Sequence, residues 1–479
     1  MNLLKEASVG IKWLAIARLS KQAFQFITLI ILARLLTPDD FGLMTTALVV
    51  IGLLNIFRDM GLSAAIIQRK LVTDELLSTL FWLSIAIGII VTSSLIIVSP
   101  LIAGFYKTPK LALILQILSF SFLITSLTLL HQALLEKDLK FNLLSKIEII
   151  STLIGAVVGI IMAINNFGVW SLVFQNLVNI SIVSAILWFN KSFKPKLHFK
   201  FRDVQSIANY SINLAGFNVV NYFVRNSDYV LIQKFLGEKL LGFYNLAYRI
   251  MLYPLQNVTA VISRVMFPVY SRLQDDNEKF RDSYVELTNL IALITFPLML
   301  WIVAVSDIFI ISLFSKKWEA VIPLLIILAP VGMIQSVYSP AGLIYQTKGR
   351  TDWWFKWGIF TGVLFILAFL IGIKWGLIGV ALGYLTANLI TFYPGLAIPF
   401  RLIDLKVNVF IRSFSKTFLI SLVMSAFIFC IKILTVDLIG QHIAFGLSLV
   451  LGFCIYLLLT FAFNRENGSR FIRFLKLSM

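Results

Sequence analysis

Two sets of polar residues repeat with helical spacing inside apolar segments of the chain. Arg18, Lys21, Gln22 and Gln25 fall at i, i+3, i+4 and i+7, which puts them on one face of a helix. The second set follows 200 residues later and consists of Asn218, Asn221, Tyr222 and Arg225. Arginine and lysine suit a diphosphate, and amides and phenols suit sugar hydroxyls. The two stripes therefore predict non-covalent binding of a lipid-linked sugar diphosphate.

Further charges occur within apolar segments, at Arg58, Asp59, Asp228 and Arg249. A charge in the hydrocarbon centre of a bilayer costs roughly 2.5–3.5 kcal/mol, so these groups should face protein or a water-filled cavity. The alternative is that Arg58 with Asp59, and Arg225 with Asp228, form local structural pairs. Arg58 and Arg249 join the predicted substrate-binding residues, and Asp59 and Asp228 are candidates for ion coupling.

Residues for covalent chemistry or metal binding are missing from these segments. The three histidines and two cysteines lie apart, without metal-ligand spacing. No Ser-His-Asp set, membrane-facing pair of carboxylates or phosphate-binding glycine loop is apparent. The sequence thus predicts a protein that is not an enzyme and needs no metal or cofactor, apart from proton or sodium coupling.

The segments that carry the two polar stripes and the further charges are predicted to be membrane spans. The chain is 59% hydrophobic and 13% charged over 479 residues, more apolar than soluble globular proteins. By the criterion of about 20 apolar residues per span, we expect about 14 transmembrane helices and an all-α polytopic fold. The polar connections are too short for a soluble domain, so the function should lie within the membrane.

The basic residues predict an orientation. With both termini in the cytoplasm, about 25 of the 41 lysines and arginines fall in cytoplasmic segments. The net charge of +18 is then explained mainly by topology. Nucleic-acid binding is not expected, because the charge is spread over many short loops and does not gather on one soluble face.

The chain also looks duplicated. A shift of 200 residues superposes seven pairs without a gap: Leu14/Leu214, Ala15/Ala215, Arg34/Lys234, Leu36/Leu236, Gly42/Gly242, Ala47/Ala247 and Ser63/Ser263. Six spans per unit make the repeats parallel, with an axis along the membrane normal. We expect a six-helix lobe at 1–190, a cytoplasmic linker at 191–203, a second six-helix lobe at 204–400, and two further helices with a cytoplasmic tail at 401–479.

Two long segments resemble the polysaccharide-transporter family of the MOP flippase superfamily. The first is TPDDFGLMTTALVVIGLLNIFRDMGLSAAIIQRK, Thr37–Lys70, and the second is RNSDYVLIQKFLGEKLLGFYNLAYRIMLYPLQNVTAVISRVMFPVYSRLQDD, Arg225–Asp276. KGRTDWW from Lys348 is also similar to a connection in that family. The likeness covers essentially the whole chain and is nearest to colanic-acid and O-antigen exporters.

The resemblance implies two six-helix lobes that alternate between cytoplasm-open and periplasm-open states in the bacterial inner membrane. The cargo would be an undecaprenyl-diphosphate-linked oligosaccharide, moved outward. The family's cationic cavity would fall on Arg18, Lys21, Arg225 and Arg249. The expected partners are this lipid-linked oligosaccharide, the lipid bilayer, and a polysaccharide polymerase with its assembly proteins.

Three other functions remain open. A flippase for the peptidoglycan precursor lipid II would share the fold and the cationic cavity. A cation-coupled drug exporter of the same superfamily would favour acidic cavity residues, which the basic stripes argue against. A membrane polysaccharide polymerase or ligase would carry a sizeable external loop, and the predicted outside loops are short.

Overall fold

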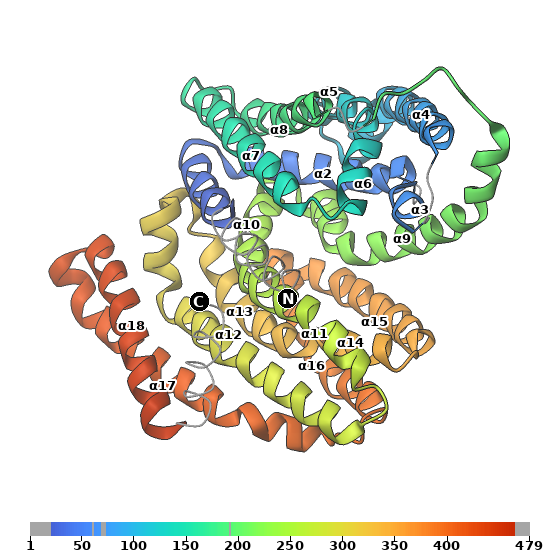
Figure 1. Cartoon of the computed structure of the whole chain (residues 1–479). Helices are drawn as coiled ribbons and strands as arrows, with labels where there is room; N and C mark the ends of the chain where they lie inside the picture. Colours follow the sequence, from blue (N-terminus) through green and yellow to red (C-terminus); the bar gives the residue numbers. More distant parts are fainter. Residues whose placement is uncertain (1–20, 60–61, 69–72, 191–192, 465–479) are drawn as a thin grey trace. The chain divides into compact units, whose positions relative to one another are not determined.

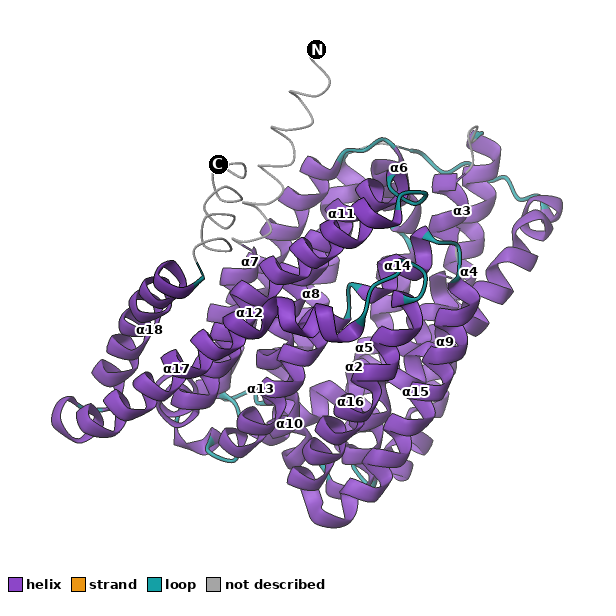
Figure 2. Ribbon diagram, turned by 90° about the horizontal axis from the view of Figure 1, so that it is seen from below, coloured by secondary structure: helices purple, strands orange, loops and turns teal. Residues whose placement is uncertain are grey.

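The chain is built from helices in the computed structural model (Figure 1). The structure describes residues 21–59, 62–68, 73–190 and 193–464, and this part of the chain contains no strand (Figure 2). Helices suit a lipid environment because each one satisfies its backbone hydrogen bonds within its own segment. The predicted all-α fold is confirmed.

The chain divides into two compact units between Gly242 and Phe243. This division counts the helix Phe201–Leu236 with the first unit, whereas the predicted second lobe begins at residue 204. The lobe boundaries stay a prediction. Residues 21–35 are helical, and the other helices of the first unit are α2 (Pro38–Asp59), α3 (Leu62–Gln68), α4 (Asp74–Tyr106), α5 (Lys110–Ser126), α6 (Leu129–Lys137), α7 (Phe141–Ile164), α8 (Val169–Phe189), α9 (Phe201–Leu236) and the start of α10 (Glu238–Pro254).

The second unit continues α10 and adds eight α-helices and three short helical turns. The turns are a π-helical turn at Leu255–Thr259 and 3₁₀ turns at Lys316–Trp318 and Ile373–Trp375. The helices are α11 (Ala260–Arg272), α12 (Asn277–Phe314), α13 (Val321–Tyr338), α14 (Ala341–Thr347), α15 (Thr351–Gly372), α16 (Gly376–Phe400), α17 (Val407–Ile439) and α18 (Gln441–Phe463).

Many of these helices can cross a membrane. Within the described ranges, nine helical segments are long and apolar enough, or ten if the bent pair α5 and α6 forms one span. One of the nine, Thr351–Phe400, contains both α15 and α16. The chain is therefore a multi-pass membrane protein, and these numbers are consistent with the prediction of about 14 spans.

Two glycines permit a very close crossing in the first unit. A Cβ atom on Gly42 would lie 1.8 Å from the carbonyl oxygen of Glu238, and one on Gly242 would lie 1.9 Å from that of Pro38. Gly42 and Gly242 are 200 residues apart in the sequence, and so are the residues that they contact, Pro38 and Glu238. In such reciprocal contacts the same surface of each repeat touches the other repeat, which is typical of a two-fold relation.

The last two helices are bonded into the second unit. Ser425 Oγ donates to the carbonyl of Leu300 at 2.8 Å, and Tyr456 OH donates to that of Leu293 at 2.7 Å. Lys432 Nζ on α17 lies 3.0 Å from Asp307 on α12. Because α12 contacts α13, α17 and α18, it is the central helix of this unit.

The connection that precedes α9 lies on the N-terminal end of α4. The backbone N–H of Lys196 donates to Ser78 Oγ at 3.1 Å, and its side chain lies 3.6 Å from Asp74. Lys200 Nζ lies 3.5 Å from Glu75. The acidic first turn of α4 thus holds part of the predicted cytoplasmic linker.

Candidate functional site: a polar cavity in the first unit

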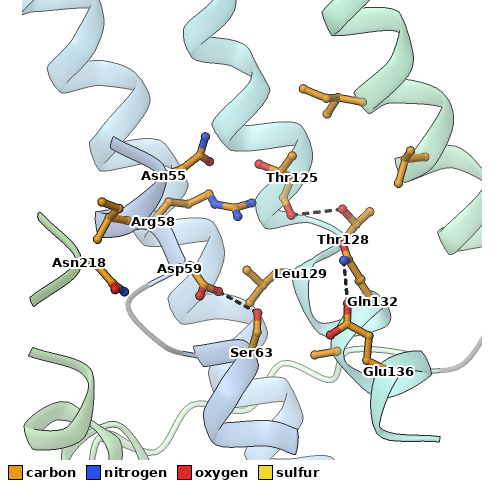
Figure 3. A pocket seen from close by; sticks show the side chains of 14 residues that line it. Asn55, Arg58, Asp59, Ser63, Thr125, Thr128, Leu129, Gln132, Glu136 and Asn218 are labelled. Atoms are coloured by element: carbon orange, nitrogen blue, oxygen red, sulfur yellow. Dashed lines mark hydrogen bonds between the residues drawn. The ribbon is translucent and has the colours of Figure 1, made fainter. Parts of the chain in front are cut away.

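A cavity of about 550 Å³ opens among six helices of the first unit (Figure 3). Its lining comes from α2, α3, α5, α6, α8 and α9. The volume is within the roughly 300–1,000 Å³ that is usual for small-molecule sites. All the helices that line it belong to one unit, so the cavity is a property of that unit alone.

The C-terminal end of α2 supplies the charged wall. Asn55, Arg58 and Asp59 follow at i, i+3 and i+4, which turns all three toward one face. The Asp59 carboxylate accepts a hydrogen bond from Ser63 Oγ at 2.7 Å (Figure 3). Arg58 Nε is buried and has no hydrogen-bond partner within the described ranges. Asp59 is therefore held by α3, and the side chain of Arg58 lines the cavity beside it.

The bend between α5 and α6 supplies a second polar wall. The two helices meet at 47°, and Thr128 at this bend donates from its hydroxyl to the Thr125 carbonyl at 3.2 Å. One turn further, Gln132 Nε2 donates to Glu136 Oε1 at 2.9 Å, and both side chains line the cavity (Figure 3). A straight continuation of α5 would turn this face elsewhere, so the bend positions it.

Asn218 reaches the cavity from α9. Tyr222, one helical turn later, donates from its hydroxyl to the Val49 carbonyl on α2 at 2.8 Å. The tyrosine hydroxyl fits because Gly52 has no side chain, and a Cβ there would lie 2.2 Å from it. This contact fixes α9 against α2 and so fixes the position of Asn218.

Among the residues that the structure describes, the charges of the lining do not add to a positive total. Arg58 is the one cation of this described lining, and Asp59 and Glu136 are its two acids. Apolar side chains complete the wall: Ile56, Leu129, Ala133, Ile180 and Val183. The site can therefore offer hydrogen-bond donors and acceptors together with an apolar surface.

Three of the predicted site residues, Arg58, Asp59 and Asn218, meet in this cavity. The cationic cavity that the resemblance implies stays a prediction, as do the roles of its residues. Arg18 lies outside the described residues. The others are not among the lining residues: within the first unit Gln25, Asn221 and Arg225 are exposed, Gln22 is half-buried and Tyr222 is bonded to α2, and Arg249 is exposed in the second unit.

Two predicted residues have definite partners elsewhere. Lys21 Nζ lies 2.6 Å from the Glu148 carboxylate on α7. Asp228 is only 3% exposed and accepts from the backbone N–H of Tyr229 at 2.8 Å. Both contacts can hold these side chains in one orientation.

Several lining residues were not among the site residues predicted from the sequence, namely Asn55, Thr125, Gln132 and Glu136. Gln132 and Glu136 have the i, i+4 spacing that turns two side chains to one helical face. That spacing could have been noticed, but nothing in it points to Arg58, which is more than 70 residues away in the chain. The part of the chain that the structure describes contains no group of three or more His, Cys, Asp or Glu residues able to hold a metal ion.

Residues 31–323 match the family model described as "Polysaccharide biosynthesis protein". The chain belongs to this family. It is 33% identical to the lipopolysaccharide biosynthesis protein WzxC of Escherichia coli, over 81% of this chain and 80% of that protein. It is also 31% identical to the teichuronic acid biosynthesis protein TuaB of Bacillus subtilis, over 98% of this chain and 99% of that one.

Solved structures share the fold of this family member. The lipid II flippase MurJ in an inward closed conformation superposes with a TM-score of 0.77 at 18% identity, covering 95% of this chain and 99% of MurJ. An inward-facing MATE multidrug transporter of the MOP superfamily superposes with a TM-score of 0.61 at 15% identity, covering 81% of this chain and 98% of the transporter. The MOP fold and the family predicted from Thr37–Lys70 and Arg225–Asp276 are confirmed. The expectation of a transporter and not an enzyme agrees with these matches.

Proposed function

We propose that this protein flips an undecaprenyl-diphosphate-linked oligosaccharide from the cytoplasmic to the periplasmic face of the membrane by alternating access. The observation that carries the proposal is a polar cavity among apolar helices in a member of a polysaccharide biosynthesis family. Polar groups within membrane spans are costly and mark the path of a polar cargo. The names of the relatives, which belong to lipopolysaccharide and teichuronic acid biosynthesis, support a glycan as cargo.

The proposed location is the bacterial inner membrane, with both termini in the cytoplasm. The positive-inside distribution of lysine and arginine supports this orientation. The partners in the pathway would be the lipid-linked oligosaccharide, a polysaccharide polymerase and assembly proteins. No resident cofactor is needed, because a flippase makes and breaks no covalent bond.

Proton or sodium coupling through Asp59 or Asp228 is part of the proposal. A carboxylate that binds and releases a cation can bias the two access states, since the ion then binds one state more tightly. Replacing Asp59 with Asn keeps the acceptor for Ser63 but removes the charge. Transport by this variant in vesicles should no longer respond to a proton or sodium gradient, and an unchanged response would exclude Asp59.

Deletion of the gene tests the proposal most directly. We expect an undecaprenyl-diphosphate repeat unit to accumulate on the cytoplasmic face, where it stays inaccessible to a glycan-modifying enzyme added to the periplasmic side. A plasmid copy of the gene should return the lipid to its normal level and restore surface polysaccharide.

Two outcomes would contradict the proposal. Accumulation of lipid II in place of another oligosaccharide lipid would identify a peptidoglycan-precursor flippase. Accumulation on the periplasmic face would indicate a block in polymerisation or ligation, the function of a membrane polymerase or ligase.

A further inference from the structure

The charge of the cavity in the first unit argues against the diphosphate as its ligand. A diphosphate carries at least two negative charges, and the described residues of this lining offer one guanidinium, Arg58, together with the carboxylates of Asp59 and Glu136. Like charges within a low-dielectric site repel strongly. The family's cargo has a second polar part, its sugars, and sugars carry no such charge unless they are modified.

The hydrogen-bonding groups of the lining fit sugar hydroxyls. A hydroxyl donates once and accepts twice, so it needs both kinds of partner. Asp59 and Glu136 each accept one side-chain bond, from Ser63 and Gln132, and an ionised carboxylate can accept about four. The side chain of Arg58 also lines the cavity, and its guanidinium carries several N–H donors. Donors and acceptors thus lie around the same space.

The positions of these groups are fixed before a ligand arrives. Ser63 holds Asp59, and Gln132 holds Glu136, so neither carboxylate needs to be ordered on binding. Asn218 is positioned by the bond of Tyr222 to α2. A preorganised site loses less entropy on binding, which favours selective recognition. Leu129 and Ile180 add an apolar wall that suits the C–H face of a sugar ring.

We propose that this cavity binds neutral sugar residues of the lipid-linked oligosaccharide and does not bind its diphosphate. The inference rests on the proposed function, because it names which part of that cargo the first unit recognises. The carboxylates of Asp59 and Glu136 accept from sugar hydroxyls, Arg58 donates to them, and the amides of Asn55, Gln132 and Asn218 do both. Sugars that carry carboxylate or phosphate groups are disfavoured at this position by the same two acids.

A binding measurement separates the two parts of the cargo. The first probe is the oligosaccharide released by mild acid from the lipid that accumulates in the deletion strain, and the second is undecaprenyl diphosphate without sugar. Purified full-length protein in detergent is titrated with each. We expect Gln132→Leu and Glu136→Gln each to weaken oligosaccharide binding at least ten-fold and to leave the affinity for undecaprenyl diphosphate unchanged.

Gln116→Leu is the matched control, because Gln116 is a half-buried glutamine on α5 that does not line the cavity. It should keep both affinities. Unchanged oligosaccharide affinity in both cavity variants would overturn the inference and leave the proposed function standing. An equal loss of both affinities, in variants that elute from a sizing column as the wild type does, would place the diphosphate here and also overturn it. If the wild type bound neither probe, the proposed function itself would fail, and the inference with it.

Discussion

Arg58 and Arg225 are both arginines of the first unit, but their surroundings differ. Arg58 lines a cavity that also holds two carboxylates, and its Nε atom is buried. Arg225 is exposed on α9 and does not line that cavity. An exposed arginine within an apolar chain keeps its full forked set of donors for a phosphate. We therefore assign the diphosphate to Arg225 as a hypothesis and the sugars to the surroundings of Arg58.

Replacement of Arg225 by Ala should abolish export while membrane insertion and expression stay near normal. A lost charge-assisted hydrogen bond costs about 1.5–3 kcal/mol, which corresponds to a roughly ten- to hundred-fold weaker affinity. Arg225→Lys should rescue in part, because lysine keeps the charge but loses the fork. Surface polysaccharide per cell, corrected for protein level, is the measurement.

The double variant Arg225→Ala, Asp228→Ala decides between substrate binding and internal pairing. If Arg225 serves only to neutralise Asp228, removal of both residues should restore export, since no charge is then left unpaired. An inactive double variant agrees with substrate binding. An active one would contradict it.

At the scale of elements, the close helix contact at Gly42 and Gly242 depends on the absence of two side chains. Gly42→Ala should lower the apparent melting temperature in detergent, because the new Cβ would lie 1.8 Å from the Glu238 carbonyl oxygen. Overpacking of this kind typically costs about 1–3 kcal/mol. Gly242→Ala should behave alike, since its contact with Pro38 is the counterpart.

Gly104→Ala provides the control for this prediction. Nothing lies within 4 Å of a Cβ at Gly104 on α4. Alanine in a helix is favoured over glycine by about 1 kcal/mol, so the melting temperature should stay the same or rise. Equal effects of the Gly42 and Gly104 substitutions would show that the crossing is not close.

The contact between α12 and α17 includes an ion pair with unequal burial. The side chain of Lys432 is 10% exposed and that of Asp307 is 44% exposed. Asp307→Ala leaves the lysine without its carboxylate, which should cost less than the roughly 3–5 kcal/mol of a fully buried pair, because Asp307 is partly exposed. We expect a clear loss of thermal stability, and Asp307→Ala with Lys432→Met should recover most of it.

The exposed pair Asp276 and Lys279 is the matched comparison, with side chains 41% and 74% exposed. Lys279→Ala should change the melting temperature little, because water already solvates both partners and Asp276 keeps its bond to the backbone at the start of α12. If the Asp307 variant melted at the same temperature as the Lys279 variant, the pair of Asp307 and Lys432 would not stabilise the contact of α17 with α12.

At the scale of the whole molecule, the orientation in the membrane can be tested with single cysteines. Cys430 and Cys454 are exposed and must be replaced first. In that background, Lys196→Cys should resist an impermeant thiol reagent added from the periplasm, because the linker is predicted to be cytoplasmic. The Lys196 side chain is 69% exposed, so a thiol there would be free to react from the correct side.

We expect the opposite labelling result for Lys110→Cys. Lys110 is exposed at the start of α5 and follows the C-terminal end of the α4 span, whereas the linker lies on the N-terminal end of that span, so the two should lie on opposite sides of the membrane. It should react with the same reagent in intact cells. Labelling of the Lys196 variant without labelling of the Lys110 variant would reverse the orientation.

Composition and spacing were sufficient to predict the class of the molecule. Long apolar segments must become helices in lipid, because unpaired backbone groups are too costly there. The offset of 200 residues predicted that Gly42 and Gly242 occupy equivalent positions, and the structure gives them reciprocal contacts. The motifs from Thr37 and Arg225 were specific enough to indicate the family.

Which residues line the cavity was decided by tertiary structure. Helical spacing orders residues on one helix, so it could align Asn55 with Arg58 but could not bring either to Glu136. That meeting depends on the bend between α5 and α6, and the packing of α9 against Gly52 adds Asn218. Lys21 illustrates the same limit, because its partner Glu148 is 127 residues away. Periodicity acts within a few turns of one helix, whereas a binding site is set by side chains that different helices bring together.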